Sequence, residues 1–225
     1  MRDEPTPSTL LARALRSDPA RPFVTYYDLR SGGRVELSVA TFENWTNKTA
    51  GLLHDELAVE PEDTVSVVLP AHWLGLVWAA ATWKVGARLV LGPSADAVVD
   101  VRAVDEEHQA VGELVLVNVA PLGGASGAAV PSGAVDYGRV VLGFPDQFGP
   151  AAALIGRAGA PGGRRLVLSE RLDDSTVDQA LLGPLRENGS VVLVRPPSGE
   201  LAPERVDAIA ATERAARPGT GLPGV

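Results

Sequence analysis

The sequence contains no cysteine, which excludes disulfide bonds, iron–sulfur clusters, thiolate zinc sites and cysteine nucleophiles. Lysine is almost as scarce, because Lys48 and Lys84 are the only two among 20 basic residues. Any mechanism that needs a lysine therefore has two candidates. The three histidines, His54, His72 and His108, are too scattered along the chain for a His-x-x-x-His pair, so we expect no metal site.

Positive charge is also in short supply. The 225 residues include 28 acidic and 20 basic side chains, which gives a net charge of −8. Nucleic-acid interfaces need a surplus of Lys and Arg, so DNA and RNA are excluded as main partners. Apolar residues make up 45% of the chain and charged residues 21%, as in ordinary globular proteins, and we expect one domain over residues 1–225.

No uninterrupted apolar helix of membrane-spanning length is expected. Residues 64–83 carry no formal charge if His72 is neutral, and this stretch is about as long as a membrane span. Pro70 interrupts it and favours a strand, a loop and then a helix. Residues 1–19 lack the apolar run of a secretory signal. We therefore expect a cytoplasmic protein that does not enter the membrane.

What is present is an alternation of strand-like and helix-like segments. The first part, residues 1–95, is predicted to contain a helix over 9–16 capped by Ser8, a hairpin of strands over 23–28 and 34–37, a helix from Ser38, a strand over 65–69, a helix over 73–84 and a strand over 88–91. The uncharged strand and the helix after it are typical of a parallel β-α-β unit.

The middle of the chain, residues 96–163, is predicted to be irregular apart from a strand over 114–119, because residues 122–133 are rich in Gly, Ala, Ser and Pro. Order returns in a second part, residues 164–216, with strands over 165–168 and 190–195, helices over 175–187 and 203–216, and a frayed tail over 217–225. Together the segments predict an α/β fold with a layered, mostly parallel sheet and helices on both faces.

Several short motifs follow one another along residues 23–93. They are Leu37-Ser38 at a helix start, Asp63-Thr64-Val65 at a turn into a strand, Leu69-Pro70 after that strand, and Lys84-Val85-Gly86-Ala87 before the next one. In this order they resemble the start of the N-terminal domain of the adenylate-forming enzymes, which are the acyl-CoA synthetases, the luciferases and the adenylation domains of non-ribosomal peptide synthetases. Glu62 and Ala71 depart from the family pattern, which has Gly and Asn there.

The second part of the chain carries a similar pairing. Asn188-Gly189-Ser190-Val191-Val192-Leu193, followed by Pro203-Glu204-Arg205-Val206, resembles a later strand and helix of the same domain. The chain length and this pairing also resemble a group of short actinobacterial proteins related to those enzymes, and the preference for arginine over lysine suits a high-GC genome. The resemblance implies a truncated N-terminal domain of an adenylate-forming enzyme.

The resemblance also implies where nucleotide chemistry should lie. These enzymes activate a carboxylate with ATP and hold the triphosphate in a loop of the form Ser-Gly-Thr-Thr-Gly-x-Pro-Lys-Gly. The possible counterpart is residues 155–163, a degenerate phosphate loop whose cofactor-binding candidates are Gly156, Arg157, Gly159, Pro161 and Gly163. The family's Ser, two Thr and Lys are replaced by Ile155, Arg157, Ala158 and Gly162. In a second register the segment is only the loop before the strand at Arg165.

The remaining family machinery has no counterpart. The aromatic-Gly-x-Thr-Glu motif, whose Glu helps to hold Mg²⁺, is missing, and the sequence ends before the hinge Asp and the domain with the catalytic Lys. Neither a Gly-x-x-x-x-Gly-Lys nor a Gly-x-Ser-x-Gly motif occurs. We therefore expect no catalytic residues and no cofactor.

The leading hypothesis is a non-catalytic relative of the adenylate-forming enzymes that acts as a binding or assembly module. Half of a two-sheet domain should leave an apolar face uncovered, so we expect a homodimer or a protein partner. One alternative is a carboxylate-activating ligase that uses ATP with Mg²⁺, forms an acyl-AMP and holds phosphate with arginines. Another is a protein that binds a nucleotide or an acyl group without turnover.

Overall fold

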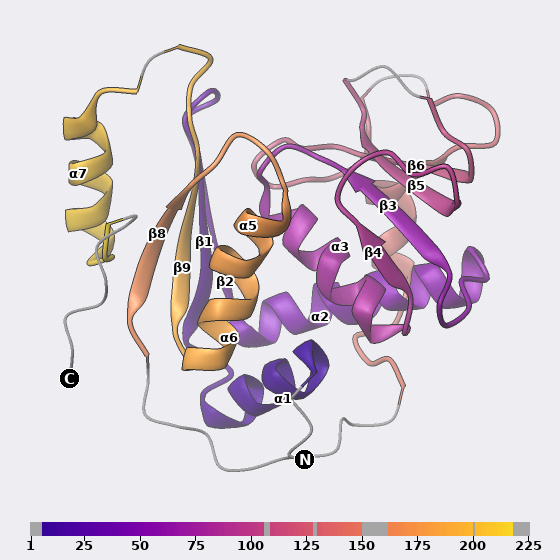
Figure 1. The fold of residues 1–225 in the computed structure, drawn as a ribbon, viewed down its shortest axis with the longest axis horizontal. Coiled ribbons are helices and arrows are strands. Elements are labelled where there is room, and N and C mark those ends of the chain that lie inside the picture. The colour runs from indigo at the N-terminus through magenta and orange to yellow at the C-terminus, as the bar shows by residue number, and fades with distance from the viewer. Residues whose placement is uncertain (1–5, 106–108, 128–129, 150–161, 200, 218–225) are drawn as a thin grey trace.

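The computed structural model describes residues 6–105, 109–127, 130–149, 162–199 and 201–217, and these residues form two β-sheets with a layer of helices between them (Figure 1). Sheet A has the strand order β2-β1-β9-β8, and sheet B has the order β4-β3-β5-β6-β7. The strands are β1 (Pro22–Asp28), β2 (Gly33–Ser38), β3 (Thr64–Val68), β4 (Arg88–Val90), β5 (Ala97–Ala103), β6 (Glu113–Val117), β7 (Val135–Asp136), β8 (Arg164–Leu168) and β9 (Ser190–Arg195). β1 and β2 pair antiparallel, and the other neighbouring pairs of named strands are parallel.

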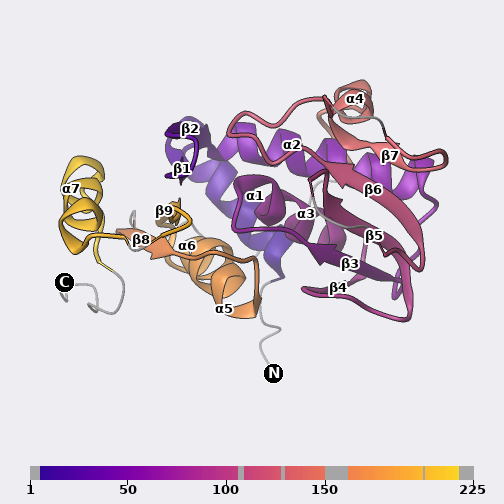
Figure 2. The ribbon, with the colours of Figure 1, turned by 90° about the horizontal axis from the view of Figure 1, so that it is seen from above.

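The helical segments are α1 (Pro7–Ser17), α2 (Val39–Gly51) with a π-helical extension η1 (Leu52–Glu56), α3 (Trp73–Lys84), α4 (Tyr137–Val140) with the 3₁₀ turn η2 (Val141–Gly143), the continuous run of α5 (Asp174–Val177), η3 (Asp178–Leu182) and α6 (Gly183–Glu187), and α7 (Pro203–Glu213). Figure 2 shows α1, α2 and α3 between the two sheets and α7 on the opposite face of sheet A. Loops, and no described helix, cover the far face of sheet B.

The central helix α3 explains the uncharged stretch of the sequence. All residues from Trp73 to Thr82 are buried. A helix that is apolar on every side is expected where protein covers every side, and here sheet B, α1 and α2 supply that cover. Among the described helices, none combines the length and the apolar character that crossing a membrane requires.

Most of the predicted elements in the two outer parts are confirmed. The hairpin forms, Ser38 caps α2 by accepting a hydrogen bond from Thr41 N–H, and β9 has the predicted bounds. The prediction for the first helix was wrong in its cap. Thr6, not Ser8, accepts the hydrogen bond from Thr9 N–H, because Pro7 occupies the first helical turn, where its missing N–H costs nothing.

Residues 96–163 are more regular than predicted. They include β6, which confirms the strand predicted over 114–119, and β5, which was not predicted; both are inner strands of sheet B. The side chains of β5 alternate as expected for a strand: Val99 and Val101 enter the core, whereas Asp100 and Arg102 lie on the far face and form a buried ion pair. The α/β class is confirmed, with two sheets where one was expected and with helices on both faces of sheet A.

Helix α7 is attached to sheet A by a small apolar cluster and by charge. Ile209 and Ala210 pack against Leu166, Val192 and Val194. At the helix end, Glu213 accepts hydrogen bonds from Arg34 Nε at 2.9 Å and from the Tyr27 hydroxyl, and Arg164 lies 3.0 Å from its other oxygen. Burial alone would raise the pKa of Glu213, but these partners outweigh it and hold the pKa below its usual range. Beyond α7, Ala216 forms a parallel bridge with Arg165 at the outer edge of β8.

Candidate functional site

The predicted phosphate loop is only partly within the described residues. Gly156, Arg157, Gly159 and Pro161 lie outside them, so their prediction is not tested. Gly163 is described, and it lies with Gly162 directly before β8. These two glycines run along the turn between α6 and β9: Gly162 N–H donates to Asn188 O at 2.9 Å, and Gly163 O accepts from Ser190 N–H at 3.2 Å.

In the register that aligns residues 155–163 with the family's phosphate loop, Gly162 takes the place of the lysine. A Cβ atom there would lie 2.2 Å from the carbonyl oxygen of Glu187, far inside van der Waals contact. The obstacle is backbone, so it cannot rotate away as a side chain could. The turn after α6 therefore leaves no room for a lysine at this position.

The described arginines next to this loop are held by carboxylates. The guanidinium of Arg165 pairs with Glu187. Arg164 donates to the Thr25 hydroxyl and pairs with Glu213 at 3.0 Å. Arg165 therefore connects β8 to the end of α6, and Arg164 connects β8 to β1 and α7. Each guanidinium already has a carboxylate partner, so neither is positioned to bind a phosphate.

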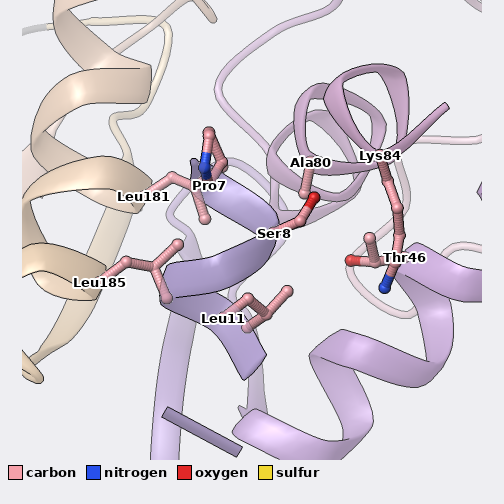
Figure 3. Close-up of a pocket in the computed structure, with 8 residues that line it drawn as sticks. All are labelled: Pro7, Ser8, Leu11, Thr46, Ala80, Lys84, Leu181 and Leu185. Carbon is pink, nitrogen blue, oxygen red and sulfur yellow. The ribbon is translucent and has the colours of Figure 1, made fainter. Parts of the chain in front are cut away.

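Lys84 is committed to contacts inside the helical layer. Its ammonium group lies 2.6 Å from Glu43 Oε1 and also donates to Asn47 Oδ1, so it ties the end of α3 to α2. Figure 3 shows Lys84 beside Thr46 at a cavity between α1, α2, α3 and the segment containing Leu181 and Leu185. The cavity measures about 10 Å³, and a space of that size holds one water molecule at most.

Lys48 is also engaged. Its ammonium group donates to the carbonyl oxygen of Phe144 and lies 3.0 Å from Asp146 Oδ1. The neighbouring Asn47 side chain donates to Asp146 O at 2.8 Å. Together these contacts fasten the segment after η2 to α2, so the second lysine also has a structural role.

The junction between the sheets is filled by the chain itself. Ligands of α/β proteins commonly bind outside the carboxyl ends of parallel strands. Here the segments after β3 and β8 bind each other, because Ala71 N–H donates to Glu170 O at 3.0 Å and Leu172 N–H donates to Leu69 O at 3.2 Å. The loop after β6 joins them through a 2.8 Å hydrogen bond from Trp73 Nε1 to the carbonyl oxygen of Pro121.

His72 lies in the middle of this junction. It caps α3 by accepting a hydrogen bond from Leu74 N–H on Nδ1, so Nε2 carries the proton and donates to Ala120 O at 3.2 Å. Its ring packs edge-on against Tyr26, with 4.6 Å between ring centroids, and both residues have no exposed surface. Burial lowers the pKa of His72 to about 3, so the ring stays neutral and is a structural cap.

The acidic residues at two turns of the chain also have structural roles. Asp63 accepts a hydrogen bond from Glu60 N–H at the turn before β3, and Asp173 caps α5. Within the described ranges, no three His, Asp or Glu side chains come close enough to hold a metal ion. Trp73 and Trp78 of α3 are buried core residues.

The far face of sheet B carries the polar group that sequence reasoning missed. Arg102 pairs there with Asp100, and both side chains are at least nine-tenths buried. They line an open cavity of about 610 Å³ together with residues of the loops before β5 and before β6. An acidic and a basic residue two positions apart in a β-branched run were the available signal, because such residues share one face of a strand.

We expected an uncovered apolar face and therefore a partner, but few large apolar side chains are exposed on the described surface. The large apolar side chains with substantial exposure come from different segments: Val98, Val111, Leu122, Leu142 and Leu168. Isolated exposed apolar residues are normal on monomeric proteins. A homodimer or a protein partner therefore remains a prediction.

The two-sheet arrangement is the fold of the acyl-CoA synthetases. Acetoacetyl-CoA synthetase from Streptomyces lividans superimposes with a TM-score of 0.67 at 17% identity, over 93% of this chain and 41% of that enzyme. An acyl-CoA synthetase from Brucella canis gives a TM-score of 0.72 at 14% identity, over 96% of this chain and 48% of that one. The chain thus spans less than half the length of these solved enzymes, and what it shares with them is the fold.

Sequence similarity then identifies the family. The chain is 33% identical over 245 residues to a TIGR03089 family protein of Mycobacterium tuberculosis, which covers 94% of this chain and 98% of that protein. The chain belongs to the TIGR03089 family. No family profile matches it.

The contact at Gly162 predicts that any side chain there destabilises the fold. We expect Gly162→Ala to lower the free energy of unfolding by about 1–3 kcal/mol, because the Cβ forces the turn after α6 to move. Gly143→Ala is the matched control, since a Cβ at Gly143 meets no atom within 4 Å, and its effect should stay within about 0.5 kcal/mol. Urea denaturation measures both, and equal stability of the two variants would contradict the packing at Gly162.

The buried His72 predicts a loss of stability in mild acid. The unfolded chain takes up a proton near pH 6.5, whereas folded His72 does so only at about pH 3, so stability is present above pH 6.5 and falls as the pH drops toward 3. Between pH 7 and pH 5 the loss should reach about 2 kcal/mol. His72→Asn keeps a capping side chain without the titration, so its unfolding free energy should vary much less over this range.

His54→Asn is the control for that measurement, because His54 is exposed and contacts only Asp55 and the ring of Phe148 among the described residues. We expect this variant to keep the pH dependence of the parent chain when unfolding is followed in urea at both pH values. An unchanged pH dependence in His72→Asn would show that His72 is not the group responsible.

Proposed function

We propose that this chain is a non-catalytic relative of the acyl-adenylate-forming enzymes that acts as a binding or assembly module. The relationship to those enzymes rests on the shared fold. The loss of catalysis is the step proposed here. It rests on the replacement of the residues that would hold a triphosphate in the family's phosphate loop.

The observation that carries this proposal is the contact at Gly162. In the register of the family's phosphate loop, Gly162 replaces the lysine, and its Cβ position lies 2.2 Å from Glu187 O. A lysine near the phosphates supplies positive charge where negative charge develops during phosphoryl chemistry. The backbone of the α6–β9 turn occupies the place of that side chain, and this supports the proposal that the lysine has been lost.

Two further observations support the proposal. Neither lysine of the chain is available as a substitute, since Lys84 binds Glu43 and Asn47 and Lys48 binds Asp146 and the Phe144 carbonyl. The junction at the carboxyl ends of the strands, where α/β folds commonly place ligands, contains His72 and Tyr26 with no exposed surface. Both features favour a role in binding over carboxylate activation.

The proposal predicts no acid-dependent ATP–pyrophosphate exchange. The purified chain is incubated with ATP, Mg²⁺, labelled pyrophosphate and a panel of carboxylic acids, and an acyl-CoA synthetase assayed in parallel confirms the conditions. We expect label in ATP at background level with every acid. Exchange that rises above background only when an acid is present would establish acyl-adenylate formation and overturn the proposal.

The two forms of the proposal, assembly and ligand binding, differ in molar mass. An assembly module predicts a mass of two chains in dilute solution, measured by light scattering during size exclusion, or a monomer that becomes a complex with its partner. A ligand-binding module predicts the mass of one chain at all accessible concentrations.

A further inference from the structure

The strand order of sheet B reverses between β3 and β5. β3 leads through α3 to β4 at one edge of the sheet, and the chain then crosses back over β3 to β5 on its other side. α/β proteins commonly bind ligands outside the carboxyl ends of the strands at such a reversal, whereas the cavity described below lies beside it, over the far face of the sheet. Here the crossing segment lies on the far face of the sheet, where the Ser66 hydroxyl donates to Gly92 O at 2.9 Å.

The cavity of about 610 Å³ lies beside this reversal. Val68 of β3 and Asp100 and Arg102 of β5 line it, together with residues 93–95 of the crossing segment and residues 109–111 before β6. Its volume lies in the range of small-molecule sites, about 300–1,000 Å³. It is distinct from the junction between the sheets, which side chains fill.

In the cavity, both oxygens of Asp100 accept hydrogen bonds, whereas Arg102 keeps N–H groups without an acceptor in the described part of the chain. Asp100 accepts from Arg102 Nη2 on one oxygen, and from Val111 N–H at 2.8 Å and Gly112 N–H at 3.0 Å on the other. Arg102 Nη1 donates to Ser66 Oγ at 3.0 Å and to the Val101 carbonyl oxygen at 3.1 Å. A guanidinium has five N–H groups, so two of them have no acceptor among the described residues.

Ser94 adds a further donor. Its oxygen accepts a hydrogen bond from Asp96 N–H at 3.3 Å, and its own hydrogen remains available. Unused donors around a buried guanidinium match an anionic oxygen group, because charge-assisted hydrogen bonds to Arg are about twice as strong as neutral ones. Asp100 already balances the charge of Arg102, so the gain comes from hydrogen bonds and the affinity should be modest.

We propose that this cavity binds the anionic oxygen group, carboxylate or phosphate, of a small organic molecule, with Arg102 and Ser94 as donors and Val68 and Val111 against its apolar part. The assignment deepens the proposed binding function by giving it a place and a ligand chemistry. The two can fail separately: acid-dependent exchange would remove the non-catalytic function, whereas the experiment below concerns only the occupancy of this cavity.

The test is a ¹H–¹⁵N NMR titration of the whole chain with butyrate, acetate, methyl phosphate and inorganic phosphate, each against sodium chloride of equal ionic strength. We expect saturable shifts at the backbone amides of Ser94, Ala95, Ala110 and Val111 with at least one probe. Shifts with butyrate and acetate assign a carboxylate ligand, and shifts with the phosphates assign a phosphate ligand. If no probe gives saturable shifts at these amides up to about 50 mM, the inference is overturned.

A variant that blocks the cavity without removing the buried ion pair tests the site while leaving the fold intact. Ala95 is exposed and lines the cavity without taking part in the Asp100–Arg102 pair, so Ala95→Phe fills the space and leaves that pair intact. We expect its affinity for the effective probe to fall at least about tenfold, a loss of about 1.4 kcal/mol. Ala134→Phe, in the separate cavity near Asp136 and Arg139, is the matched control and should bind as the parent chain does.

Discussion

The burial of α3 on every side constrains the rest of the molecule. Sheet B lies against this helix on one side and α1 and α2 lie against it on the other, so its middle cannot carry charge. Its one basic residue, Lys84, is at the final turn, where Glu43 and Asn47 bind the ammonium group. At the other end the neutral ring of His72 supplies the cap. The same burial brings the segments after β3 and β8 into contact and closes the junction between the sheets.

Much of this architecture was predictable from local sequence. Ser38 before an apolar face and the Ser31-Gly32-Gly33 turn between two strand-like runs gave α2 and the β1–β2 hairpin, because caps and turns depend on neighbouring residues. The division into two sheets was not predictable in this way. β1 pairs with β9, more than 160 residues later in the chain, and no local pattern records that partnership.

In the candidate site, too, the local sequence shows which residues are present, whereas their contacts come from distant segments of the chain. The sequence shows Gly162 at one possible lysine position, but not that a Cβ there would lie 2.2 Å from the carbonyl oxygen of Glu187 at the end of α6. The alternation of Asp100 and Arg102 was visible in the sequence, but their burial depends on Ser66 and on the backbone N–H groups of Val111 and Gly112. Whether a charged pair in a strand is buried can be determined only when the loops that cover it are known.

The two edge strands of sheet A determine whether another copy of the chain can pair with this sheet. β2 forms one border and presents the charged side chains of Arg34 and Glu36, while Ala216 pairs with the outer side of β8 at the other. Unprotected strand borders are where foreign strands add and where amyloid-like growth begins. Charged side chains on β2 and the pairing of Ala216 with β8 therefore oppose the addition of a foreign strand at the two borders of sheet A.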